Sequence, residues 1–162
     1  AVRVGREEAV GERIRELALG VRAEDMLYAL SLAEKVPNVN LRSSLVQSLL
    51  KKFNNGSKRA IKGLAHITGG GFVDNIPRVL PEKLDVVIRK GSWDMLPIFK
   101  MIVDQGGVPE AELYQVFNMG IGMVAIVAAE QADAAMKFIR AQKHAAWIIG
   151  EVVRGGGEAR VV

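Results

Sequence analysis

The stretch AHITGGGFVDNIPRVLPEKL, residues 65–84, decides how the chain from residue 60 onward is organised. A short apolar run, Ala60–Ala65, leads into it and has the length of a strand. Three consecutive glycines, Gly69–Gly71, then break the pattern, and apolar residues at positions 73, 76 and 79 predict a short helix that ends before Pro81. A strand, a glycine loop and a helix in this order are typical of a domain that layers helices on a sheet.

Strands and helices continue to alternate beyond this stretch. The apolar patterns predict strands at 84–88, 121–128, 146–153 and 159–162, and helices at 93–105, 109–117 and 130–142. We expect the last two strands to pair with each other across Arg154–Gly157. The fold class predicted for residues 58–162 is therefore α/β (α+β), with a mixed sheet and helices packed on it.

Residues 1–57 have a different texture. Helical apolar stripes predict helices at 7–19, 23–36 and 41–53, and the polar segment Asn54–Ser57 forms a strong break. We therefore expect two parts: a helical segment over residues 1–57, of unknown origin, and a domain over residues 58–162.

Composition narrows the function classes. The net charge is +4, and residues 1–60 supply it with 11 basic and 7 acidic side chains. No aromatic side chains interleave with these basic residues, so nucleic acid is not the expected partner. If the chain did bind nucleic acid, its affinity would fall steeply as the salt concentration rises. The chain has no cysteine, no membrane-length apolar run and no signal-peptide core, which indicates a cytoplasmic protein without membrane attachment.

The glycine loop offers the clearest chemistry. Thr68 supplies a hydroxyl, Gly69, Gly70 and Gly71 supply backbone N–H groups, and the helix that follows adds a partial positive charge. His66 could donate to a phosphate or act as an acid or base. A tight turn in which His66 caps locally explains the same residues equally well, so both readings stay open on chemistry alone.

Two other groups of residues belong to this hypothesis. In FNMGIGM, residues 117–123, glycines at alternate positions clear one face of a strand, and Asn118 could cap the preceding helix in the left-handed region. Capping and close packing are the alternative reading of this motif. Asp74, Asn75 and Arg78 share a helical face that could line the same pocket, or could simply face solvent.

The motifs taken together resemble a known family. KGLAHITGGGF (residues 62–72) and NIPRVLP (75–81) are followed by GSW (91–93), PIF (97–99), FNMGIGM (117–123) and WIIGEV (147–152). In this order they resemble the C-terminal domain of aminoimidazole ribonucleotide (AIR) synthetase, or phosphoribosylformylglycinamidine cyclo-ligase. The resemblance covers about residues 60–162.

The resemblance implies an activity and roles for particular residues. The family uses ATP, with Mg²⁺, to activate the amide of a phosphoribosylated substrate, and an internal amine then closes the imidazole ring in purine biosynthesis. By this resemblance His66 is the catalytic histidine, and Thr68, Gly69, Gly70 and Gly71 bind substrate or phosphate. Asn75 and Asn118 would support the same cleft, and no metal ligand is expected in this chain.

The resemblance has a gap at the N-terminus. The family's glycine- and aspartate-rich nucleotide-binding domain has no counterpart in residues 1–57. We therefore expect the chain to need that domain, or a second chain, as a partner, and to be inactive alone. The alternative is a non-catalytic protein of the same fold that binds a phosphate-bearing ligand or serves as a scaffold. A homodimer is also an open alternative, although the family dimerises chiefly through the absent domain, so the resemblance does not require this chain to dimerise.

Overall fold

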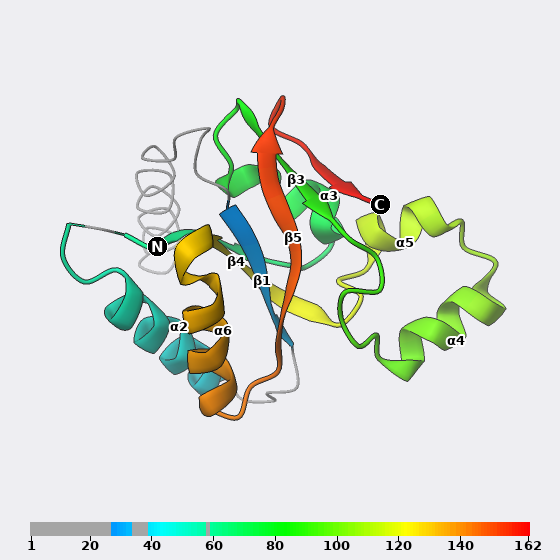
Figure 1. Ribbon diagram of the computed structural model, residues 1–162. Helices are drawn as coiled ribbons and strands as arrows, with labels where there is room; N and C mark the ends of the chain where they lie inside the picture. The colour runs from blue at the N-terminus through cyan, green and yellow to red at the C-terminus, as the bar shows by residue number, and fades with distance from the viewer. Residues whose placement is uncertain (1–26, 34–38, 58) are drawn as a thin grey trace, which may run out of the picture.

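A computed structural model describes residues 27–33, 39–57 and 59–162, and side chains from residue 44 onward. In this part of the chain, strands form a single mixed sheet in the order β2-β4-β1-β5-β3-β6 (Figure 1). All neighbouring strands are antiparallel except β3 and β6, which are parallel. The strands are β1 (Leu27–Ala33), β2 (Ile61–His66), β3 (Leu84–Ile88), β4 (Ile121–Ala128), β5 (Ala146–Arg154) and β6 (Ala159–Val161).

Helices cover both faces of this sheet (Figure 1). Along β4, Val124 and Ile126 belong to one buried cluster, whereas Ala125 and Val127 belong to the other, as the alternation of side chains along a strand requires. The first cluster includes residues of α3 (Gly71–Asn75) and α5 (Glu110–Val116), and the second includes residues of α2 (Val39–Phe53) and α6 (Ala132–Ala141). The sheet therefore has a core on each side, and the predicted α/β class is confirmed.

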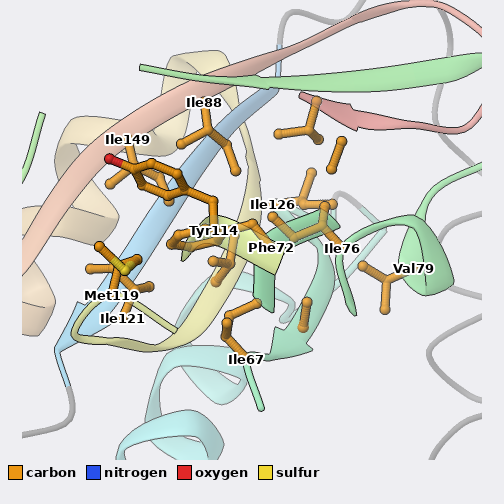
Figure 2. Packing of buried hydrophobic residues seen from close by; sticks show 14 of the residues in the cluster. Ile67, Phe72, Ile76, Val79, Ile88, Tyr114, Met119, Ile121, Ile126 and Ile149 are labelled. Carbon is orange, nitrogen blue, oxygen red and sulfur yellow. The ribbon is translucent and has the colours of Figure 1, made fainter. Parts of the chain in front are cut away.

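The first cluster lies beneath the glycine loop. Figure 2 shows Ile67, Phe72, Ile76, Tyr114, Met119 and Ile121 within it. The rings of Phe72 and Trp93 meet edge to face with their centroids 5.6 Å apart, and Tyr114 lies 6.4 Å from each of them. Aromatic packing of this kind holds the elements around the loop in one arrangement.

The N-terminal prediction is partly wrong. The helix expected over residues 23–36 is instead the strand β1 over Leu27–Ala33, which lies between β4 and β5. Its residues satisfy a helical spacing, but pairing with strands on both sides outweighs that local preference. The helix expected at 41–53 is confirmed as α2, while the helix expected at 7–19 lies outside the described residues. The division into two parts at residue 57 stays a prediction.

The remaining elements follow the prediction closely, with one error of pairing. Strands β3 and β4 have the predicted bounds, and α4 (Pro97–Gly106) begins at the proline expected to limit its first turn. Two short 3₁₀ helices, Pro77–Val79 and Ala129–Gln131, accompany α3 and α6. However, β6 does not pair with β5: it lies beside β3, because the loop that precedes it is held on Asp85.

Candidate functional site

Two loops meet at the ends of the neighbouring strands β2 and β4. The first, residues 66–71, leaves β2, and the second, residues 117–122, enters β4. Since the strands are antiparallel, His66 lies opposite Met123. The Ile67 N–H then donates a hydrogen bond of 2.9 Å to the carbonyl of Gly122. The structure thus brings together the two motifs that the sequence singled out.

Different structural reasons account for a glycine at each of the three positions of the first loop. Gly70 and Gly71 have φ angles of 94° and 54°, in the left-handed region that favours glycine. A Cβ at Gly71 would also overlap the carbonyl of Tyr114, so α5 lies directly against this position. Gly69 is exposed, and a Cβ there would meet nothing within 4 Å. Turn geometry and packing therefore account for two glycines, and Gly69 is left as the position where an approaching ligand would benefit most from a bare backbone.

Asn75 holds this loop from inside. Its side chain is buried, and its Nδ2 donates to the carbonyl of Gly71 at 2.8 Å and to that of Gly69 at 3.2 Å, with Thr68 at the limit of 3.5 Å. The predicted shared face with Asp74 and Arg78 is wrong, because both of those side chains are exposed whereas Asn75 points into the core. Asn75 is therefore a positioning residue, which turns the loop's carbonyl oxygens inward.

Asn118 organises the second loop. Its Oδ1 accepts the N–H of Gly120 at 3.0 Å, and its carbonyl accepts the N–H of Ile121 at 2.9 Å. The left-handed residues are Met119, with φ 50°, and Gly120, with φ 89°, so the expected left-handed cap at Asn118 itself is wrong. Both central residues of this turn have positive φ, as in a type I′ turn. A positive φ is unfavourable for methionine, and the Trp93 indole N–H, which donates to the Met119 carbonyl at 3.0 Å, helps to hold it.

The polar side chains His66 and Thr68 are both exposed, on either side of the buried Ile67. An imidazole and a hydroxyl therefore face solvent next to the loop backbone. Fewer groups of the loop are free to bind an anion than expected. The Gly71 N–H already donates to the Thr68 carbonyl at 3.0 Å, and the helix α3 is only five residues long. Any contact with phosphate would depend on side chains and on the loop before Gly71.

Metal binding finds no support within the described parts of the chain, where no group of three or more His, Cys, Asp or Glu side chains could hold an ion. No helix in those parts is long and apolar enough to cross a membrane.

Asp85 is a buried carboxylate that the sequence analysis missed. Its Oδ1 accepts the N–H groups of Gly156, Gly157 and Glu158 at 2.7, 3.0 and 2.9 Å, and its Oδ2 lies 2.9 Å from Arg160. The hydrogen bond from Glu158, with those from the two glycines and the charge of Arg160, outweighs burial and lowers the pKa of Asp85. The signal available was one acidic residue inside the apolar strand LDVVI.

Comparison with known sequences gives a family. A family model described as "AIR synthase related protein, C-terminal domain" matches residues 14–162. The chain is 45% identical over 124 residues to a phosphoribosylformylglycinamidine cyclo-ligase of Geobacillus thermodenitrificans, covering 76% of this chain and 34% of that protein. It is 52% identical over 96 residues to the protein of the same name from Acetivibrio thermocellus, covering 59% and 28%. The chain thus spans about a third of the length of these relatives.

Solved structures agree on the fold. E. coli HypE, a hydrogenase maturation protein, matches with a TM-score of 0.58 at 19% identity, over 89% of this chain and 47% of HypE. T. maritima PurL complexed with AMPPCP matches with a TM-score of 0.56 at 13% identity, over 88% of this chain and 24% of PurL. At these identities the likeness concerns the fold alone.

Proposed function

Because the chain belongs to the family of AIR synthase related proteins, matching its C-terminal domain, we propose that it forms part of the active site of an ATP-dependent cyclo-ligase. The reaction would close the imidazole ring of formylglycinamidine ribonucleotide in purine biosynthesis. The observation that supports this most strongly is the pair of loops at the ends of β2 and β4, where the exposed His66 and Thr68 lie beside motifs that resemble this family.

We assign each loop residue a role in this proposal. His66, at the end of β2, would contact the reacting substrate and hold or transfer a proton. Thr68 and the backbone of Gly69 and Gly70 would approach the phosphate of the ribonucleotide, where a bare backbone allows close contact. Gly71 and Asn75 would keep that backbone in position through their contacts with α5 and with the loop carbonyls.

Asn118 would act from the second loop, by holding the turn that leads into β4. The Ile67–Gly122 hydrogen bond connects that turn to the glycine loop, so a change in one loop would be transmitted to the other.

ATP and Mg²⁺ would be bound mainly by the part of the cyclo-ligase relatives that lies outside the region matched by this chain. ATP would supply the activation of the substrate amide. The described residues offer no acidic cluster for a metal ion, and the cyclo-ligase relatives are about three times as long as the matched region. We therefore propose that the chain alone does not turn over substrate and works with a partner domain.

The two histidines of the chain allow a controlled test. We would assay ring closure by the purified chain, and by the chain co-expressed with the unmatched portion of the G. thermodenitrificans relative. The chain alone should give no product, and the combination should give product. His66→Ala should lower turnover by about 100-fold or more. His144→Ala, on the loop after α6, should not.

Turnover by the chain alone would contradict the need for a partner. Equal turnover by the two histidine variants would remove His66 from the site. Binding of a phosphate-bearing ligand without any reconstituted turnover would favour the alternative of a non-catalytic protein with this fold.

A further inference from the structure

Exposed apolar side chains concentrate at α4. Among the residues whose exposure the structure describes, six large apolar side chains are exposed, and four of them lie within residues 95–103. Ile98 and Met101, which are 49% and 47% exposed, are three positions apart on α4 and so lie on one side of it, and Met95, which is 37% exposed, lies two residues before the helix begins. We call these three residues the α4 patch. Apolar side chains gathered in this way on a soluble protein mark a surface that another molecule covers.

The other side of α4 is already occupied. Phe99 and Ile102 pack against the first cluster, which lies beneath the glycine loop. No residue of α4 is fully buried. Figure 1 shows α4 projecting beyond the edge of the sheet, away from α2 and α6. The helix is therefore anchored along one side, and the α4 patch is not needed for that anchoring.

The anchored side of α4 contacts the second loop of the candidate site. A Cβ on Gly120 would lie 3.4 Å from the Leu96 side chain and 3.7 Å from that of Phe99. The Phe99 ring also packs against Phe117, with centroids 6.1 Å apart. A polypeptide seated on the α4 patch would thus lie on the helix that packs against the turn at residues 118–121.

We propose that the α4 patch is the docking surface for the polypeptide that the cyclo-ligase relatives carry beyond the region this chain matches. Two observations favour this occupant: the relatives are about three times as long as the matched region, and the helix that carries the patch packs, through its anchored side, against the loop at residues 117–122. Methionine and isoleucine side chains suit a close apolar contact with a folded partner. The proposal rests on the proposed function in naming the partner, although docking itself requires no catalysis.

The test compares two doubly substituted chains. Ile98→Glu with Met101→Glu places two charges on the α4 patch. Ala134→Glu with Ala141→Glu places two charges on exposed positions of α6, on the other side of the molecule. Each chain is co-expressed with the tagged, unmatched portion of the G. thermodenitrificans relative, and the dissociation constant of the purified complex is measured without substrate. We expect the α4 variant to bind about tenfold more weakly or worse, and the α6 variant to bind like the wild type.

A second measurement keeps the test decisive if the two pieces do not associate in trans. Joining the relative's portion to this chain in one polypeptide should slow hydrogen exchange in α4 relative to the free chain, and should leave α6 unchanged. Equal affinity of the two variants, unchanged exchange in α4, or a dimer of the free chain that the α4 substitutions abolish without affecting the partner would each overturn the proposal. Because docking is measured without substrate, loss of docking and loss of ring closure are separate results.

Discussion

The chain has two triple-glycine loops, Gly69–Gly71 and Gly155–Gly157, and they have opposite polarity. In the first, the Asn75 amide lies inside and donates to the loop's carbonyl oxygens. In the second, the Asp85 carboxylate lies inside and accepts the loop's N–H groups. The second loop is an anion-binding nest already occupied by the protein's own carboxylate. The sequence Gly-Gly-Gly can therefore be interpreted as a ligand site only when the buried side chain behind the loop is known.

The largest expected effect separates glycines within the first loop. Gly71→Ala should lower the free energy of unfolding by about 3 kcal/mol or more, because the new methyl group overlaps the Tyr114 carbonyl at a left-handed residue. Gly69→Ala should change it by no more than about 0.5 kcal/mol, since its Cβ meets open space. Urea denaturation of both variants checks this, and similar losses would mean that Gly69 also has a packing role.

The next effect tests the donor behind the first loop. Asn75→Ala should cost about 2 kcal/mol, because the buried carbonyl of Gly71 and the partly buried carbonyl of Gly69 lose a hydrogen-bond donor. The exposed Arg78→Ala is the control and should be close to neutral. Denaturation of the two variants measures the difference. A neutral Asn75→Ala would show that the loop keeps its shape without the inward amide.

The smallest effect at neutral pH should come from Asp85→Asn, and it carries a pH signature. The pKa of folded Asp85 is lowered, so the ionised group stabilises the fold above its unfolded pKa, and this contribution is lost as the pH falls through the folded value. Wild type should therefore melt above the variant at neutral pH, and the difference should begin to shrink as the pH falls below about 4.

Asp104→Asn, on the exposed side of α4, is the matched control for this comparison. Its melting temperature should follow that of the wild type at every pH. A constant difference between wild type and Asp85→Asn across the whole pH range would show that the carboxylate's charge is not what holds the second loop.

Local patterns predicted the elements well but not their partners. Strands β3 and β4 have their predicted bounds because each is a short apolar run between turn residues. The strand β1 was missed since its neighbours, β4 and β5, come about 90 and 120 positions later in the chain, beyond the reach of any local pattern.

The candidate site shows the same limit. The motifs indicated the two loops, and their ordered resemblance to one family indicated His66 and Asn118. The inward role of Asn75 and the hold of Asp85 on residues 156–158 depend on which side chains the fold buries. Spacing along the chain does not contain that information, so both roles emerged only from the three-dimensional structure.

The central place of β1 has a consequence for shortened forms of the protein. A chain that began at residue 58, after the polar break, would lack the strand between β4 and β5. The sheet would separate into β2–β4 and β5–β3–β6, each with an unpaired edge of apolar sequence. Edges of this kind pair with other molecules, so aggregation rather than a smaller stable domain is the expected result of such a truncation.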